Sequence, residues 1–247
     1  MKVALIRMDG WDAAMLAASC CVSSEMPTEL KRGGLMRAIE SGHLSILEHV
    51  AVTFTIEGIS RACSHQLVRH RLASYAQQSQ RYVDMKGFGY TTPKSIAECG
   101  SELYAGDDGD GNPIEVSMAE VYDDFMKEAS HVYTTLVANG IPEEDARYVL
   151  PNACCTNLVV TMNLRELSHF LGLRRCARAQ DEIRALADEM ARQVLDAMFD
   201  AGILVKPSSE KELEPQATFL NLLMPQCHRL GFCPEKNGCG KFGRKEA

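Results

Sequence analysis

The sequence predicts an α+β protein with one central antiparallel sheet and long helices. Residues 49–57 alternate apolar with smaller or polar side chains and are rich in β-branched residues, which is typical of a half-buried strand. Residues 117–138 and 179–200 instead place their apolar side chains at helical spacing over many turns. A chain of 247 residues with 46% hydrophobic and 24% charged residues can bury a sizeable core.

The predicted strands lie in the N-terminal half. We expect the strand at 49–57 to pair with a second strand at 88–92 in the same antiparallel sheet. Gly58 indicates a sharp turn into a helix that runs from about residue 60 to residue 71. Residues 98–112 are polar, acidic and rich in glycine, so they predict a surface loop.

The C-terminal half is predicted to be mainly helical. Ser117 and Glu120 form a capping-box pattern that opens the helix over 117–138, and Gly140 follows its end. The helix over 179–200 is expected to stop before Gly202. Between these two, residues 142–149 and 155–171 predict shorter helices. Residues 1–205 are expected to form a single domain, and residues 206–247 a Cys-rich C-terminal extension.

Charge and hydropathy limit the function. The chain has 26 basic and 33 acidic residues and a net charge of −7, which argues against a nucleic-acid-binding surface. No run approaches the ~18 apolar residues of a membrane span, and residues 1–7 are too short an apolar stretch for a signal peptide. We therefore expect a soluble, cytoplasmic protein with neither nucleic acid nor membrane as a partner.

The ten cysteines fall into two groups. Seven are scattered through residues 1–205 and include the adjacent pairs 20–21 and 154–155; reduced, buried thiols are the simplest interpretation. The other three, Cys227, Cys233 and Cys239, lie in the extension with five residues between successive members. Zinc ligands usually lie closer together in sequence, so three alternatives stay open: a metal centre (zinc, or iron–sulfur with a fourth ligand elsewhere), free thiols or a disulfide.

The most informative segment is 66–82. The triplet Arg69-His70-Arg71 is followed by a loop rich in Gln and Ser that ends at Arg81. The triplet alone is also what a solvated basic face would contain. The loop favours a different interpretation, because arginine guanidinium groups and serine hydroxyls close together suit phosphate oxygens. A nucleotide or dinucleotide is the expected ligand.

This segment resembles the signature of the flavin-dependent thymidylate synthases, in which an Arg-His-Arg triplet precedes a serine by seven or eight residues. Here seven residues separate Arg71 from Ser79. The resemblance covers roughly residues 1–205, with Ile46 at a usual proline and Asp181 at a usual tryptophan. Further matching stretches are Gly42-His43-x-Ser45-x-x-Glu48-His49, Ala146-Arg147-x-x-Leu150-Pro151, Asn163-x-Arg165, Leu171-x-Leu173-Arg174 and Ala179-Gln180-x-Glu182-Ile183.

The resemblance implies a single catalytic domain that methylates dUMP reductively to dTMP. Methylenetetrahydrofolate would give the carbon, and FAD reduced by NADPH would give the hydride. The family is homotetrameric, with active sites between subunits. It binds FAD without a Gly-x-Gly-x-x-Gly fingerprint, and this chain also contains none.

The resemblance also assigns site residues, and it implies no metal in the active site. Arg174 is expected to polarise the uracil ring, so that no cysteine nucleophile is needed. Gln77 stands where many members carry Glu, and His169 where some carry Asn. The expected dUMP contacts are Gln66, Arg69, Gln77, Ser79, Arg81, Arg147 and Arg174. The expected FAD contacts are His43, Ser45, Arg69, His70, Arg71, Gln77, Asn163, Arg165 and His169.

Two other functions compete with this one. The first is a non-catalytic, nucleotide-binding regulatory module whose extension binds a metal. The second is a thiol-dependent enzyme that uses Cys154 or Cys155, although both lie in an apolar stretch that does not activate a thiol. Ser79 is not expected to act as a nucleophile, because the loop supplies no clear general base beside it.

Overall fold

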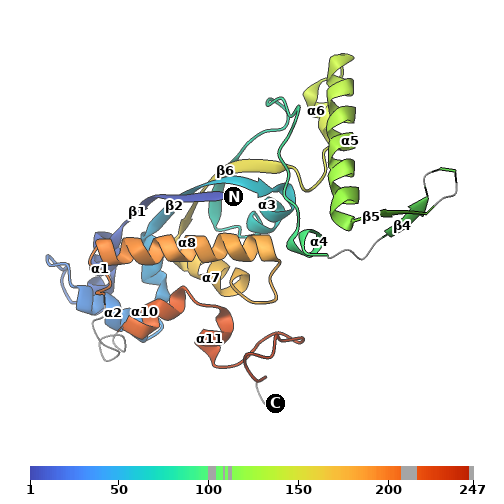
Figure 1. Cartoon of the computed structure of the whole chain (residues 1–247). Helices are drawn as coiled ribbons and strands as arrows, with labels where there is room; N and C mark the ends of the chain where they lie inside the picture. Colours follow the sequence, from blue (N-terminus) through green and yellow to red (C-terminus); the bar gives the residue numbers. More distant parts are fainter. Residues whose placement is uncertain (100–103, 108, 111–112, 207–215, 245–247) are drawn as a thin grey trace. The chain divides into compact units, whose positions relative to one another are not determined.

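The computed structural model describes residues 1–99, 104–107, 109–110, 113–206 and 216–244. These residues fall into two compact units (Figure 1). Unit 1 consists of Met1–Ile56, Leu67–Ala76 and Val159–Ala247, and unit 2 of Glu57–Gln66 and Gln77–Leu158. Within the described residues no helix is both long and apolar enough to cross a membrane.

The main sheet has four strands in the order β1 (Lys2–Asp9), β2 (Ala51–Ser60), β6 (Cys155–Asn163) and β3 (Ala73–Gln77). Side-chain hydrogen bonds fix the direction of the central pair. The hydroxyls of Thr53 and Thr161 lie 2.9 Å apart, and Gly58 N donates to Asn157 Oδ1 at 3.0 Å. Because the residue numbers run in opposite directions, β2 and β6 are antiparallel. The predicted α+β class with an antiparallel sheet is confirmed.

The predicted helix at 155–171 is wrong in its first half. Residues 155–163 form strand β6, and helix α7 (Leu164–Arg174) begins directly after it. Alternate side chains of β6 are buried, from Thr156 to Met162, which is the two-residue period of a strand. Asn163 separates the two elements, because its Oδ1 accepts a hydrogen bond from Glu166 N at 2.8 Å and so caps α7.

Three other local predictions also differ from the structure. Residues 88–92 form no strand; only Tyr90 makes an isolated antiparallel bridge, to Cys154. Helix α3 (Arg61–Leu67) ends before the Arg-His-Arg triplet, which occupies the turn that follows. The segment expected to be a surface loop contributes β4 (Tyr104–Asp107), which pairs antiparallel with β5 (Pro113–Val116); the rest of that loop lies partly outside the described residues.

Helices surround the sheet in unit 1. They are α1 (Trp11–Cys20), α2 (Arg32–Glu40), the 3₁₀ helix η1 (Leu44–His49), α7 and α8 (Asp181–Asp200). The last of these is the long helix that the sequence predicts. It packs on β1 and α7 through a buried stripe, Ile183, Leu186, Met190, Val194 and Met198. From the same helix, the Gln193 amide accepts a hydrogen bond from Leu5 N and donates one to Val3 O, both on β1.

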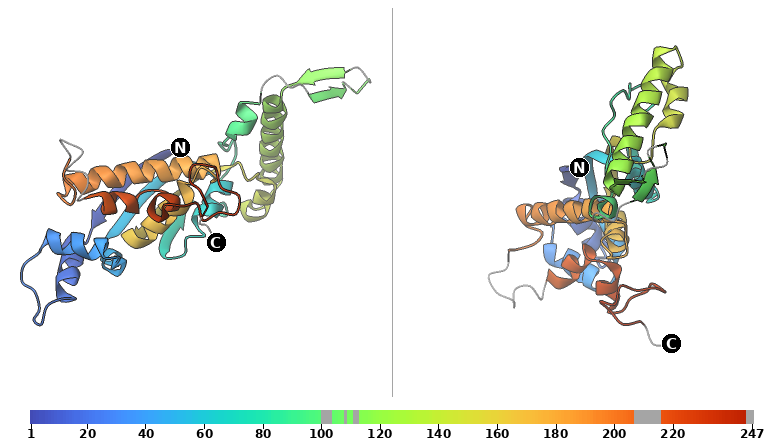
Figure 2. Two further views of the ribbon diagram at one scale, coloured as in Figure 1. Left: turned by 90° about the horizontal axis from the view of Figure 1, so that it is seen from below. Right: turned by 45° about the vertical axis from the view of Figure 1, so that its right-hand side comes forward.

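The described part of the extension belongs to unit 1. It contains α10 (Ala217–Leu222), which packs on α2 and α7, and α11 (Gln226–Leu230), which packs on α7 (Figures 1 and 2). Phe219 of α10 is fully buried. The domain boundary expected between residues 205 and 206 stays a prediction.

Unit 2 is built around α5 (Met118–Ala138), with the short helices α4 (Lys94–Ala97), α6 (Glu143–Ala146) and η2 (Arg147–Val149). The predicted capping box is present, because Ser117 and Glu120 exchange side-chain-to-backbone bonds. The core of this unit includes Met85, Phe88 and Tyr133, and the Tyr133 hydroxyl accepts a hydrogen bond from Met85 N at 3.1 Å. This packing holds the segment after the Gln/Ser loop against α5.

Candidate active site

A buried histidine connects two charged side chains in unit 1. His70 is only 4% exposed and lies in the turn after α3. Arg174, at the end of α7, donates from Nε to His70 Nε2 at 3.2 Å. On the other side of the ring, His70 Nδ1 lies 3.5 Å from the Glu166 carboxylate, which is also buried. Since Nε2 accepts the bond from Arg174, the proton of the neutral ring is on Nδ1 and faces Glu166.

The surroundings keep His70 neutral. Burial, then the positive charge of Arg174 and the neighbouring His169, lower the pKa of His70 to about 4. Phe170 packs edge-on against the ring at 4.9 Å between centroids. The Tyr75 hydroxyl donates a hydrogen bond to the His70 carbonyl oxygen at 2.8 Å, which restrains the backbone at His70. Burial, together with nearby Glu166, raises the pKa of Tyr75 to about 12, so this hydroxyl keeps its proton.

Three of the predicted dUMP contacts come together in unit 2. Arg81 makes an ion pair with Glu144 at 2.7 Å, and Arg147 Nε donates to the backbone oxygen of the same Glu144 at 2.9 Å. Ser79 Oγ accepts a hydrogen bond from Arg81 N at 3.2 Å. Two guanidinium groups therefore contact one residue, Glu144, and the Ser79 hydroxyl bonds to the backbone of one of the two arginines. Such a set binds phosphate oxygens well.

Two glutamines of the predicted site also belong to unit 2: Gln77 at the start of the same loop, and Gln66 on α3. Gln77 Nε2 donates to Ser64 Oγ at 3.0 Å and to Thr156 Oγ1 at 3.2 Å. Both hydroxyl residues are buried, so the amide of Gln77 is fixed and its oxygen faces away from them. Gln66 is half-buried on α3 in the same unit. A held neutral amide suits a nucleobase edge, which offers both donors and acceptors.

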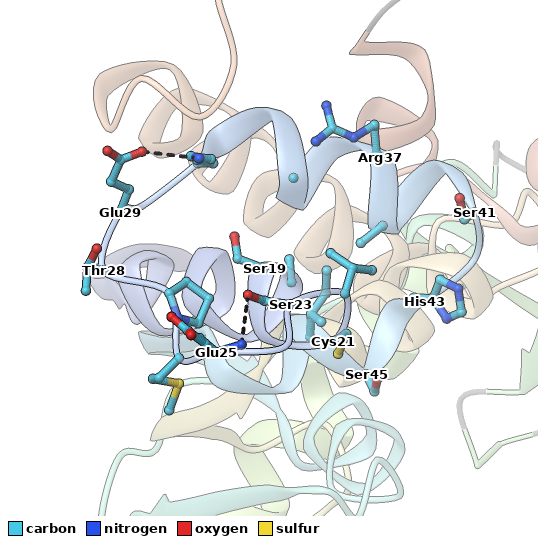
Figure 3. A pocket seen from close by; sticks show the side chains of 18 residues that line it. Ser19, Cys21, Ser23, Glu25, Thr28, Glu29, Arg37, Ser41, His43 and Ser45 are labelled. Carbon is cyan, nitrogen blue, oxygen red and sulfur yellow. Dashed lines mark hydrogen bonds and ion pairs between the residues drawn. The ribbon is translucent and has the colours of Figure 1, made fainter.

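His43 and Ser45 line a pocket of about 850 Å³ in unit 1 (Figure 3). Helix α1 and the segment after it contribute Ser19, Cys21 and Ser23 to this pocket, and Arg37 comes from α2 on the opposite side. The volume is in the range of small-molecule sites. Its hydroxyls and its guanidinium group are donors that suit a phosphate-containing ligand.

Arg165 and His169 line a second cavity, of about 280 Å³, on the exposed side of α7. Arg165 makes an ion pair with Glu48. The His169 ring lies 5.8 Å from that of His70, so this cavity adjoins the buried histidine. Arg229 of the extension also lines it, with Nη1 at 2.9 Å from Ser168 Oγ and Nη2 at 2.8 Å from Ser168 O.

The remaining predicted residues have simpler positions. Arg69 and Arg71 are exposed beside buried His70. Asn163 caps α7, so its side-chain oxygen already has a partner. Unit 1 holds Arg69, Arg174 and all the predicted FAD residues except Gln77, while unit 2 holds Gln66, Gln77, Ser79, Arg81 and Arg147.

Three residues that contact or line the candidate site were not identified from the sequence: Glu166, Glu144 and Arg37. Glu144 stands three residues before Arg147 in a run of acidic residues. Glu166 adjoins Arg165 in a predicted helix, and helical spacing places the two side chains in different directions. The sequence does not indicate that Glu166 lies beside His70 or that Glu144 pairs with Arg81. No signal in the sequence indicates Arg37.

Cys154 is not suited to act as a nucleophile. Cys154 is fully buried, and burial, with Cys155 next to it, raises the pKa of Cys154 to about 11. A thiol with so high a pKa carries almost no thiolate at neutral pH. This agrees with the expectation of structural thiols and opposes the thiol-dependent enzyme.

Two clustered arginines, a fixed amide, and a buried neutral histidine bonded to an arginine are groups that suit a nucleotide as ligand. Comparison with known proteins gives the family. The family model described as "Thymidylate synthase complementing protein" matches residues 5–198. A flavin-dependent thymidylate synthase of Geobacter sulfurreducens is 47% identical over 208 residues, which cover 78% of this chain and 82% of that protein. One of Thermococcus onnurineus is 41% identical over 220 residues, covering 86% and 78%. The chain belongs to the family of flavin-dependent thymidylate synthases.

Solved structures agree on the fold. A UMP/dUMP methylase, PolB of Streptomyces cacaoi, bound with 5-Br dUMP, matches with a TM-score of 0.63 and 27% identity, over 81% of this chain and 94% of that one. The flavin-dependent thymidylate synthase of Helicobacter pylori, complexed with FAD and dUMP, matches with a TM-score of 0.59 and 24% identity, over 80% and 96%.

Proposed function

We propose that this enzyme methylates dUMP reductively to dTMP, with methylenetetrahydrofolate as the carbon donor and FAD reduced by NADPH as the hydride source. Family membership over residues 5–198 supports the overall reaction. The observation that supports the proposed mechanism is the hydrogen bond from Arg174 to His70. It holds a permanent cation at the end of α7.

Arg174 is proposed to polarise the uracil ring of dUMP. A methyl group is added to C5, so electron density has to move into the ring without a cysteine adduct. A guanidinium group near N3 and O2 of uracil stabilises the negative charge that develops there. The bond to neutral His70 restricts the rotation of Arg174 before substrate binds, which reduces the ordering required in the transition state.

The phosphate of dUMP is proposed to bind Ser79, Arg81 and Arg147. Arg81 is then expected to exchange its bond with Glu144 for a phosphate oxygen, because a dianionic phosphate attracts the guanidinium group more strongly than one exposed carboxylate. Gln66 and Gln77 are proposed to orient the base, and Arg69 completes the set of dUMP contacts that the family resemblance implies.

FAD is proposed to bind the residues that the family resemblance implies, Gln77 among them. The residues present fit such a group, because the pocket lined by His43, Ser45 and Arg37 combines a cation, hydroxyls and apolar walls. The other proposed contacts are Arg69, His70, Arg71, Asn163, Arg165 and His169. Reduced FAD supplies the hydride when it is bound. No metal is proposed in this site.

A homotetramer is proposed as the active assembly, as the family resemblance implies. Several large apolar side chains support association of copies, because they are exposed on the single chain; Phe125 is 59%, Leu72 72% and Tyr148 83% exposed. Sedimentation or light scattering of the purified protein tests the assembly directly.

The proposed function is tested by visible absorption of the purified protein under anaerobic conditions, followed by a product assay. We expect a flavin spectrum that bleaches with NADPH, and formation of dTMP when dUMP and methylenetetrahydrofolate are added. A protein that binds dUMP but neither carries nor takes up FAD would instead be the nucleotide-binding regulatory module. Flavin reduction without dTMP would contradict the proposed methyl transfer.

A further inference from the structure

Four cysteines of this chain line one small cavity, and the proposed reaction uses none of them. Cys227, Cys233 and Cys239 come from the extension, whereas Cys176 follows α7 in the catalytic part of the chain. The cavity has a volume of about 30 Å³. The extension thus meets its fourth cysteine about fifty residues earlier in the sequence, where spacing alone could not identify it.

We propose that Cys176, Cys227, Cys233 and Cys239 bind a thiophilic metal centre, either a zinc ion or an iron–sulfur cluster. Four cysteine thiolates are the ligand set of both. Such a centre would join the end of the extension to the segment that follows Arg174. The proposal concerns the extension and does not depend on the reaction proposed above.

The backbone of the extension is folded around one of these sulfur atoms. Helix α11 carries Cys227 and ends at Gly231, which has a positive φ of 72°. Cys233 N then donates to Gly243 O at 2.8 Å, which closes the segment between them into a loop. Inside this loop the backbone at Gly238 lies so close to Cys233 that an added Cβ would be 2.9 Å from its sulfur. Cys239 is the next residue.

The extension has little else to hold this conformation. After Leu223, Cys233 is the only buried apolar residue among those that the structure describes. Segments this short are usually stabilised by a disulfide or a metal rather than by a hydrophobic core. All ten cysteines are free, Cys233 included. A metal centre is therefore the stabilising element that the available side chains can provide.

The four thiols surround the cavity without converging on one point. Among the described residues, no three His, Cys, Asp or Glu side chains meet closely enough to hold a single ion. A zinc ion binds sulfur at about 2.3 Å, so rotation about χ1 of the cysteines is required to bind it. An iron–sulfur cluster is larger than a single ion, so the cavity of about 30 Å³ has to widen to hold one.

A separate set of contacts positions the extension on α7, near Cys176. Arg229 bonds to Ser168 of α7, whose hydroxyl donates in turn to Leu222 O at 2.9 Å. Gly172, one turn further along α7, leaves the space that the Arg229 guanidinium occupies, since an added Cβ there would overlap it. Cys176 lies a further turn's length beyond Gly172 in sequence. The extension is thereby docked beside Cys176 before any metal binds.

The test is metal and sulfide analysis of the full-length protein, purified anaerobically and also after incubation with Zn²⁺ or with Fe²⁺ and sulfide. We expect either about one zinc per chain, without colour, or several irons with equal sulfide and a broad brown absorption after flavin removal. Protein that holds neither metal after both incubations overturns the proposal. Two disulfides among these four cysteines, detected by thiol counting and peptide mapping, would also overturn it.

Single replacements assign the ligands. Cys176→Ser and Cys239→Ser should each lose most of the metal, whereas Cys20→Ser should retain it, because Cys20 is exposed at the end of α1 and does not line the cavity. Circular dichroism and flavin content show whether each variant remains folded. If a folded Cys176→Ser variant keeps all the metal, Cys176 is not a ligand. That result would contradict the four-thiolate centre.

Discussion

Arg174 Nε donates to His70 Nε2 at 3.2 Å, and this bond exists only while His70 is neutral. A proton on Nε2 would remove the acceptor and place two cations against each other inside unit 1. The same contact therefore links the position of Arg174 to the protonation state of a residue a hundred positions earlier in the chain. The nearby Glu166 carboxylate faces the opposite nitrogen of the ring and favours the tautomer that accepts the bond.

The first prediction concerns pH and stability. The pKa of His70 is about 4 in the folded chain, against an ordinary value of 6.5, so the folded state binds fewer protons between these limits. The contribution of His70 to stability is therefore complete above pH 6.5 and is lost as the pH falls toward 4. Its full size is roughly 3 kcal/mol. Urea unfolding of the wild type and of His70→Asn measures it at several pH values and one protein concentration.

The difference in unfolding free energy between these two proteins should shrink as the pH is lowered from 6.5 to 4. Other groups titrate in both proteins and cancel in the comparison. A difference that is constant over this range would mean that His70 titrates normally in the folded state.

The second prediction concerns Glu166 as a positioning residue. Glu166→Gln keeps the size of the side chain but removes the charge that favours a proton on His70 Nδ1, so Arg174 is held less firmly. We expect kcat to fall about tenfold with little change in flavin content. The loss of one hydrogen bond costs about 1.4 kcal/mol, which corresponds to a tenfold change in rate. Steady-state kinetics measure this.

Glu189→Gln is the matched control, because Glu189 is on α8 and pairs with Arg192. It should leave kcat unchanged. In a His70→Asn background, Glu166→Gln should have no further effect on kcat, because the connection to Arg174 is already broken. Additive effects of the two replacements would exclude action through His70.

The third prediction concerns Arg174 itself. Arg174→Ala should abolish dTMP formation and largely retain FAD, because the cation acts on the uracil ring. Arg174→Lys should recover little activity, since an ammonium group does not reproduce the planar, multi-donor geometry of guanidinium. Flavin absorbance and dTMP yield are measured on the same samples. Unchanged turnover in Arg174→Ala would remove Arg174 from the mechanism.

The fourth prediction concerns the phosphate cluster. Arg81→Ala should raise the Kd for dUMP about tenfold or more, because a charge-assisted hydrogen bond contributes ~1.5–3 kcal/mol. Glu144→Gln should lower that Kd a few-fold, since it removes the carboxylate that pairs with Arg81 at 2.7 Å. Calorimetric titration with dUMP measures both constants. If Arg81→Ala binds dUMP normally, the phosphate lies elsewhere.

The fifth prediction concerns Cys154 and Cys155. Replacing both with Ala should leave the rate of dTMP formation within about twofold, because the pKa of Cys154 is about 11 and it provides no thiolate. Treatment of the wild type with iodoacetamide should not label Cys154 while the protein is folded. Loss of turnover in a folded double variant would favour the thiol-dependent mechanism.

Many residues of the candidate site could be proposed from the sequence, because they lie in short motifs. The family resemblance places Ser79, Arg81 and Arg147 among the dUMP contacts. In the structure both arginines contact Glu144, and Ser79 bonds to Arg81 N. Glu166 could not be paired with His70 in this way, because ninety-six positions separate them and the contact arises only when α7 packs beside the turn after α3.

The fold was predicted less completely. Residues 155–163 form a short apolar segment, and such segments are compatible with either a strand or a helix until their neighbours are known. Pairing with β2 decides the outcome, and the Thr53–Thr161 contact is part of it. The long helices α5 and α8 were predicted well, because their apolar stripes persist over many turns and their ends carry capping residues.

The amide of Gln193 has a consequence for how copies of this chain can associate. It satisfies Leu5 N and Val3 O on β1, which is an outer strand of the four-stranded sheet. An outer strand with free backbone groups can recruit a strand from another molecule and lengthen the sheet. Here a side chain from α8 already bonds to these two backbone groups, so neither of them is available to pair with a strand from another molecule.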